Sequence, residues 1–242
     1  MNWIIIILAI VLVVILWYVY TILNSAPSVA SNVDLSTTPL SITGDKIEGG
    51  TSSTYAIGCW IYVKNMPSDE TAIFNYVVDN TQPITVSSGN SNVLFNLTLS
   101  NSTPTLLAKV RKGTSTNSSL ESITISNNLP IQSWVYVLVS VSSNYIDSYL
   151  NGKLVVSTPI TSVYSPANFP VNNASGPTFV STGSPPVIIT GLSRWNTPLD
   201  PQTVWSYYSQ GNGNATQQML GSTYHLDVVF KKDSKTHNLS LF

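Results

Sequence analysis

The sequence predicts an all-β protein, a two-sheet sandwich with one short helix near the C-terminal end, preceded by a single apolar helix at the N-terminus. About ten short runs rich in β-branched and aromatic residues follow one another between residues 55 and 231, separated by turn residues and without alternating helices. Ahead of them stands one uncharged segment that is too long for a strand. The 242 residues therefore divide into an anchor (1–24), a linker (25–50) and the sandwich (51–242).

The first segment, Trp3–Leu23, reads WIIIILAIVLVVILWYVYTIL and contains no charged side chain. At about 1.5 Å per residue, such a helix just spans the hydrocarbon core of a bilayer, about 30 Å thick. Trp3, Trp17, Tyr18 and Tyr20 stand toward its ends, where aromatic rings suit the membrane interfaces. A cleaved signal peptide would have a basic start and a shorter apolar run. We therefore expect a retained transmembrane helix with the lipid membrane as its partner.

Residues 25–50 lack helical periodicity and are rich in Ser, Thr, Pro and Gly. This composition predicts a stalk that leads into a first short strand near Leu40–Ile47. In the sandwich, Tyr55–Val63 is apolar on both faces, as in a strand buried between two layers. We expect Trp60 and Trp134 to pack in the core. The other expected strands are Thr71–Val78, Asn92–Leu99, Thr105–Val110, Ser119–Ser126, Trp134–Ser142, Tyr145–Leu150, Lys153–Thr158, Pro186–Ser193 and Tyr224–Lys231.

An Asn-Gly pair, Asn151 and Gly152, joins two of these strands. Asn-Gly between apolar runs predicts a two-residue type I′ turn, in which both residues take positive φ. The resulting register sets Tyr149 opposite Leu154 and Asp147 opposite Val156. We expect this hairpin to be scaffold, so that replacing Gly152 by Val damages the fold of the whole domain.

The short helix is predicted by its end signals. Asp200 is placed as N-cap, Pro201 as the first helical residue and Gly211 as the C-terminal stop. The expected apolar stripe consists of Val204, Trp205 and Tyr208.

The composition excludes several classes of function. With 10 basic and 11 acidic side chains, the chain offers no basic face for nucleic acid. His225 and His237 have no cysteine beside them, so no metal ligands are expected, and no row of carboxylates suits a glycosidase. Cys59 stands in the most apolar strand and is expected to be an inert buried thiol. We therefore predict no catalytic, cofactor-binding or metal-binding residue, and no enzyme.

Three segments together resemble the concanavalin A-like, laminin G-type jelly roll: YAIGCWIYV, WVYVLVSVSSNYIDSYLNGKLVVS and VIITGLSRWNTPLDPQTVWSYYSQG. The third segment matches best, through Gly191, Asn196, Leu199, Val204, Tyr208 and Gly211. The resemblance covers roughly residues 51–211 and implies a jelly-roll sandwich. The residues expected to define this fold are Trp60, Trp134, Asn151, Gly152, Gly191, Trp195, Asp200, Pro201, Val204, Tyr208 and Gly211.

The anchor joined to such a sandwich is also similar to membrane-anchored virion proteins, the minor capsid proteins of large double-stranded DNA viruses. This resemblance implies a structural protein of the virion that links the internal membrane to the capsid shell, with other capsid proteins as partners and the domain facing the capsid. The alternative is a membrane-displayed carbohydrate-binding, lectin-like module, with Trp195 and Tyr207 as candidate residues for stacking on glycans. A lectin is expected to expose a Trp or Tyr beside clustered Asn side chains.

Overall fold

The computed structural model describes residues 3–23, 28–30, 32–47, 50–78, 92–101, 103–113, 118–162, 164, 177–212, 227–232 and 235–240. Two helices and one 3-10 turn accompany the described strands. The helices are α1 (Trp3–Leu23) and α2 (Pro201–Ser209), and the 3-10 turn η1 is Gly44–Lys46. The strands are β1 (Ser28–Ala30), β2 (Val33–Asp34), β3 (Ser41–Ile42), β4 (Tyr55–Val63), β5 (Thr71–Val77), β6 (Val93–Leu99), β7 (Leu106–Gly113), β8 (Ser118–Ser126), β9 (Trp134–Val141), β10 (Tyr145–Leu150), β11 (Lys153–Pro159), β12 (Thr178–Val180), β13 (Val187–Trp195), β14 (Asp227–Lys232) and β15 (Lys235–Ser240).

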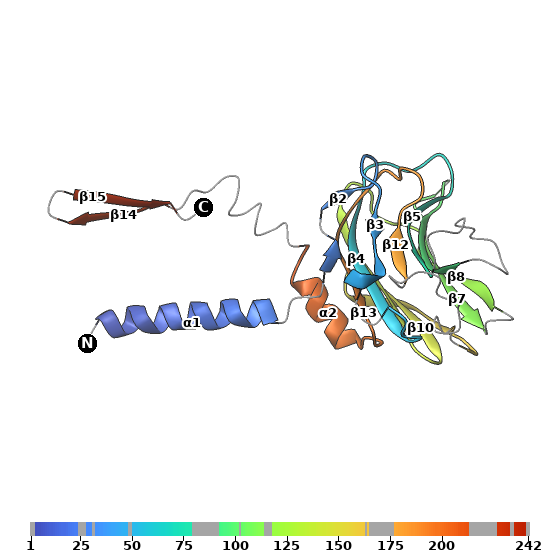
Figure 1. Ribbon diagram of the computed structural model, residues 1–242, viewed down its shortest axis with the longest axis horizontal. Helices are drawn as coiled ribbons and strands as arrows, with labels where there is room; N and C mark the ends of the chain where they lie inside the picture. Colours follow the sequence, from blue (N-terminus) through green and yellow to red (C-terminus); the bar gives the residue numbers. More distant parts are fainter. Residues whose placement is uncertain are drawn as a thin grey trace.

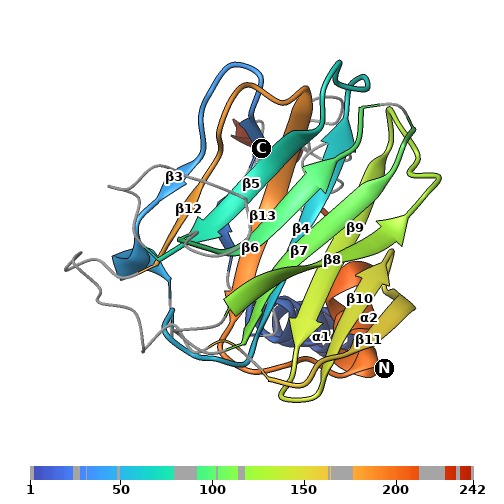
Figure 2. The same ribbon diagram turned by 90° about the vertical axis from the view of Figure 1, so that its right-hand side faces the viewer.

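The strands form two packed antiparallel sheets. Sheet A has the order β1-β13-β4-β9-β10-β11, with β2 also pairing with β13, and sheet B has the order β3-β12-β5-β6-β7-β8. Figure 1 shows the two sheets as layers with α2 on the outer side of sheet A, and Figure 2 shows the strands of sheet B in front of those of sheet A. The expected two-sheet sandwich with a short helix near its C-terminal end is confirmed. β14 and β15 pair with each other, away from the sandwich in Figure 1.

The core lies between the sheets because alternate residues of each central strand point inward. In sheet A, Ile57, Cys59 and Ile61 of β4 are at most 2% exposed. In sheet B, Phe74 lies between two aromatic neighbours, with ring centroids 5.9 Å from Phe95 and 5.7 Å from Phe179. These buried rings pack among the aliphatic side chains that make up most of the core.

An arginine that no sequence pattern singled out also lies in this interior. Arg194 of β13 is 3% exposed, and its guanidinium carbon lies 5.3 Å from the ring centroid of Tyr55 and 5.5 Å from that of Tyr76. Its Nη2 donates to the backbone oxygens of Ser52 (3.3 Å) and Gly50 (3.5 Å). Because Tyr55 belongs to sheet A and Tyr76 to sheet B, the buried cation links the two layers.

The linker expected at residues 25–50, with one short strand near Leu40–Ile47, instead contributes three short strands to the sandwich. β1 and β2 both pair with β13 of sheet A, and β3 pairs with β12 of sheet B. The first described strand after α1 begins at Ser28, with only four residues between it and the end of the helix. The expected strand near Leu40–Ile47 is reduced to Ser41–Ile42, followed by η1.

The N-terminal segment is helical over Trp3–Leu23, the range expected from its sequence. Trp3 and Trp17 are exposed, at 79% and 65%, whereas the side chains of Tyr18 and Tyr20 lie outside the described residues. Among the residues whose side chains the structure describes, which in α1 are Trp3 and residues 7–17, no helix is both long enough and apolar enough to cross a membrane.

The β10–β11 hairpin has the expected turn but a shifted register. Asn151 has φ +49° and Gly152 φ +76°, as a type I′ turn requires, and Tyr149 lies opposite Leu154. Asp147, however, lies opposite Ser157 rather than Val156. The prediction for Asp147 was wrong because a bulge between Ser148 and Tyr149 adds one residue to β11.

Candidate functional site

Helix α2 is held on the outer face of sheet A by its N-terminal cap. The Asp200 carboxylate accepts hydrogen bonds from the backbone N–H groups of Gln202 (2.9 Å) and Thr203 (3.1 Å), and from the Thr203 hydroxyl (2.6 Å). The hydrogen bonds from Thr203 hold the pKa of Asp200 below its ordinary value. Pro201 is the first helical residue, and Gly211, with φ +78°, follows the helix end. The predicted end signals of this helix are confirmed.

This cap makes a specific prediction. Asp200→Ala removes the acceptor for two backbone donors, so we expect the midpoint of thermal unfolding to fall by about 2–4 °C. Asp200→Asn keeps a capping oxygen of the same size and is the matched control, expected to melt close to the parent. Far-ultraviolet circular dichroism during heating measures both, and equal melting of the Ala and Asn variants would contradict the capping role.

The inner side of α2 packs on a small apolar cluster outside the main core. Val204 is fully buried against Ala56, Leu138 and Tyr149 of sheet A. At the start of the helix, the backbone N–H of Leu199 donates to the Ser140 hydroxyl (2.9 Å). The expected stripe is corrected at Trp205, which lies over the hairpin turn at Gly152 rather than on this cluster and is 48% exposed.

A strip of aromatic rings extends from α2 along the outer face of sheet A. The pairing of β4 with β9 sets Trp60 opposite Tyr136 and Tyr62 opposite Trp134. Ring centroids lie 5.3 Å apart for Trp60 and Tyr136, 5.5 Å for Tyr62 and Trp134, and 5.5 Å for Trp60 and Tyr208 of α2. We call these five residues the aromatic strip. Trp60, Tyr62 and Trp134 are only half-buried, so part of the strip faces solvent.

The expectation that Trp60 and Trp134 pack in the core is therefore wrong. Both residues point to the outer face of sheet A, because the inward positions of these strands are taken by aliphatic side chains such as Ile61 and Val135. Trp60 still has a packing role against α2, whereas the described ring partner of Trp134 is Tyr62. Gly191 lies at the bulge of β13 with φ +61°, where a Cβ atom would meet Trp60 Cδ1 at 3.6 Å.

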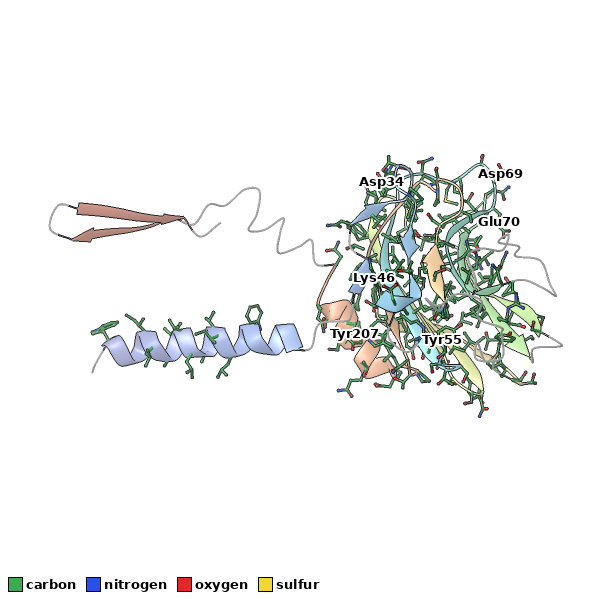
Figure 3. The ribbon with its side chains drawn as sticks, viewed as in Figure 1. Asp34, Lys46, Tyr55, Asp69, Glu70 and Tyr207 are labelled. Carbon is green, nitrogen blue, oxygen red and sulfur yellow. The ribbon has the colours of Figure 1, made fainter. Side chains whose placement is uncertain are left out.

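The other candidate rings stack on each other. Trp195 and Tyr207 have ring centroids 4.9 Å apart, and Trp195 Nε1 donates to the Tyr207 hydroxyl (3.3 Å). The two rings of this pair thus pack on each other, as the neighbouring rings of the strip also do. Tyr207 lies on the side of the sandwich from which α1 extends, whereas Asp69 and Glu70 lie on the far side (Figure 3).

A polar group borders the strip. Asp34 lies opposite Ile188, and Ile188 lies opposite Tyr62, so Asp34 and Tyr62 belong to one row on the same face. Lys64 Nζ donates to Asp34 Oδ2 (2.5 Å) and to the Ser36 hydroxyl (2.9 Å). The hydrogen bonds from Lys64 and then from Ser36 hold the pKa of Asp34 at about 2. Asp34 is therefore an ionised acceptor at neutral pH and not a general acid.

Three described carboxyl groups have pKa values shifted away from what a general acid needs. Asp34, Asp45 and Asp200 all have lowered pKa values, from side-chain hydrogen bonds in each case, whereas a general acid needs a raised one. Burial raises the pKa of the Cys59 thiol to about 12, so it stays protonated at neutral pH. In the described part of the chain, no three His, Cys, Asp or Glu side chains gather into a metal site.

Clustered asparagines occur on the outer face of sheet B. Asn96 donates to Asn75 Oδ1 (2.7 Å), and Thr98 donates to Asn96 Oδ1. Asn75 and Asn96 are fully buried and Thr98 is 3% exposed. Asn75 and Asn96 are therefore on the other sheet from the aromatic strip, and they are hydrogen-bonded to each other.

Two antiparallel sheets, a short capped helix on one outer face and an aromatic face beside it define a jelly-roll domain of the lectin-like class. The profile of the concanavalin A-like lectin/glucanase superfamily, of laminin G type, matches residues 35–207, and the chain belongs to this superfamily. No curated protein matches the chain.

Solved structures with a similar fold share little sequence with the chain. The receptor-binding domain of botulinum neurotoxin mosaic serotype C/D has 14% identity and a TM-score of 0.49, over 72% of this chain and 40% of that one. The serotype D ligand-binding domain in complex with N-acetylneuraminic acid has 13% identity and a TM-score of 0.49, over 76% and 42%. The sialidase of Trypanosoma rangeli in complex with sialic acid has 12% identity and a TM-score of 0.43, over 70% and 24%. The chain thus spans less than half the length of each.

Proposed function

We propose that this protein is a non-enzymatic, membrane-tethered carbohydrate-binding module whose aromatic strip binds sugar rings. The observation that supports this proposal best is the row of half-buried rings at Trp60, Tyr62 and Trp134 on one face of sheet A. Aromatic rings with one free face offer apolar area to the C–H faces of a sugar, and their edges leave room for polar contacts. Asp34 and Lys64 supply hydrogen-bonding groups at the border of the strip.

The absence of catalysis is part of the proposal. The described acids nearest to the strip and to α2, Asp34 and Asp200, are held ionised by hydrogen bonds. A glycosidase needs one carboxyl that stays protonated near neutral pH to protonate the leaving group. A chain with 10 basic and 11 acidic side chains also lacks the strong field that would select a highly charged ligand. We therefore infer a neutral sugar as the ligand class.

The tether is proposed from the sequence of the first segment. Residues 3–23 contain no charged side chain and are helical. Such a segment is expected to insert into a bilayer, because each Leu, Ile or Val contributes roughly 0.3–0.6 kcal/mol to insertion at the centre of a helix. The sandwich would then be displayed at the membrane surface.

Binding of the full chain in detergent micelles to an array of neutral glycans tests the carbohydrate proposal. We expect a retained glycan, and we expect Trp134→Ala to weaken its binding about tenfold because the variant loses one stacking ring. Tyr145→Ala is the control, since Tyr145 is a 51% exposed ring outside the strip and its loss should leave binding unchanged. The proposal fails if no glycan is retained, or if Trp134→Ala binds as the parent does.

A second candidate function is structural. It is favoured by the same apolar segment, which is separated from the first strand of the sandwich by only four residues. In this alternative, the protein links the internal membrane of a virion to the capsid shell, and capsid proteins are its partners. Chemical cross-linking of purified particles would distinguish the two functions: cross-links from the sandwich to capsid subunits support the structural role, and none are expected for a displayed lectin.

A further inference from the structure

Exposed apolar side chains gather at one corner of the sandwich, between α2 and the turn of the β10–β11 hairpin. Leu154, Val155 and Trp205 are 48%, 43% and 48% exposed. Trp205 lies directly on the turn, because a Cβ atom on Gly152 would approach its Cε3 atom to 2.8 Å. Lys153 follows Gly152 and is also exposed. We call Lys153, Leu154, Val155 and Trp205 the corner patch.

The helix beside this patch has no charged side chain from Pro201 to Ser209. Trp205 and Ser206 are exposed positions of this helix. The Asp200 carboxylate at its N-terminus accepts capping hydrogen bonds from the helix. Lys153 is thus the one charged residue of the corner patch. A Trp ring, aliphatic side chains and a lysine are the residue types that proteins place at the headgroup region of a bilayer.

The position of α2 relative to the N-terminal helix is a second, independent indication that the corner patch faces a bilayer. β1 pairs with β13 so that Ser28 lies opposite Ser193, two residues before Trp195, and the ring of Trp195 packs on Tyr207 of α2. From Leu23 at the end of α1 to Ser28, the chain can span at most about 18 Å. In Figure 1, α1 extends from the side of the sandwich that carries α2. A bilayer that holds α1 therefore lies within reach of α2.

We propose that the sandwich docks on the surface of the bilayer that holds α1, through α2 and the corner patch. This inference rests on the membrane tether of the proposed function. Trp205 and Leu154 enter the headgroup region, and Lys153 contacts anionic headgroups. The aromatic strip lies on the same outer face of sheet A as α2, so the docked domain presents it to carbohydrate carried by that same membrane.

The test uses the full chain reconstituted in vesicles of phosphatidylcholine with a minor share of phosphatidylserine. A spin label on Ser206→Cys reports the environment of α2 while Trp205 is retained, and a label on Thr124→Cys of β8 is the matched exposed control on the outer face of sheet B. The buried thiol of Cys59 is not expected to react. Collision rates with oxygen and with a water-soluble nickel complex give the depth of each label. Vesicle flotation after washing with alkaline carbonate tests the tether separately.

Docking predicts an oxygen-to-nickel collision ratio several times larger for Ser206→Cys than for Thr124→Cys. Adding Trp205→Gln or Lys153→Glu to Ser206→Cys should bring the ratio close to that of Thr124→Cys, while the protein still floats with the vesicles. If the chain floats but both labels are equally aqueous, docking is wrong and the tether stands. If the chain does not float after the carbonate wash, the tether and the docking proposal both fall.

Discussion

Gly152→Ala is expected to lower the free energy of unfolding by about 3 kcal/mol and the midpoint of thermal unfolding by about 6–12 °C. Two costs add at this position. Gly152 has φ +76°, where a residue with a Cβ atom is strained by about 1–2 kcal/mol. Its Cβ atom would also lie 2.8 Å from Trp205 Cε3 and 2.9 Å from Tyr208 Cδ1, so α2 must shift away from the sheet. Gly152→Val, with two more methyl groups, should be worse.

Gly183 provides a matched control for this prediction. Its φ of +77° is nearly the same as that of Gly152, but a Cβ atom there would meet nothing within 4 Å. Gly183→Ala should therefore cost only the conformational part, about 1–2 kcal/mol. Chemical denaturation measures the free energy of unfolding of both variants. The difference between the two losses is the contribution of α2 packing against the turn. Equal losses in the two variants would show that Trp205 and Tyr208 do not press on the hairpin.

The strands with a strong pattern were predictable from the sequence. β4 and β10 have the predicted bounds because their apolar residues run through the strand and turn residues bound it. The turn at Asn151 and Gly152 was predictable for a local reason, since few residue pairs tolerate two successive positive φ angles. The prediction of α2 also rests on local signals, because Asp200 and Pro201 mark the start of a helix whatever surface the helix packs against.

Structural features that depend on contacts between distant parts of the chain could not be predicted from local sequence patterns. β1, β2 and β3 have two or three residues each, too few for any periodicity, and only their partners β13 and β12 make them strands. The bulge that moves Asp147 from Val156 to Ser157 has no glycine signal in either strand.

The candidate site shows the same limit. A strand that is apolar on both faces does not say how far a helix covers its outer face, and α2 leaves Tyr62 and Trp134 half-buried. The aromatic strip exists because the register of β4 and β9 sets these rings side by side, and register is a long-range property. Trp195 and Tyr207, predicted as stacking candidates from their residue types alone, turned out to stack on each other.

The domain is expected to unfold cooperatively between about pH 10 and 12, because its interior holds tyrosines in the neutral form. Burial raises the pKa of Tyr76 to about 12, an effect that Arg194 only partly offsets. Burial likewise raises the pKa values of Tyr55 and Tyr136, and that of Cys59 to about 12. In the unfolded chain these groups lose their protons at lower pH, so the unfolded state binds fewer protons and is favoured as the pH rises.

For Tyr76 alone, the stabilisation is complete below about pH 10, and about 1 kcal/mol of it is lost at about pH 11 and about 2 kcal/mol at about pH 12. Tyrosinate absorbance and far-ultraviolet circular dichroism, followed together during an alkaline titration, measure the effect. We expect a fraction of the 12 tyrosines to ionise only with the loss of β structure. If every tyrosine ionised near pH 10 with the circular dichroism unchanged, the prediction would be wrong. The tyrosine hydroxyls would then be accessible to water in the folded protein.

Tyr76→Phe separates the ionisation of this residue from its packing. The variant loses the hydrogen bond from the Tyr76 hydroxyl to the backbone oxygen of Gly50 (2.6 Å), so at neutral pH it should be about 1 kcal/mol less stable than the parent. It has no proton to lose at this position, and its free energy of unfolding should therefore fall less steeply above about pH 10. The two curves should meet or cross by about pH 12, because the parent then loses about 2 kcal/mol that the variant retains. Parallel curves would mean that the Tyr76 hydroxyl ionises as easily in the folded protein as in the unfolded chain.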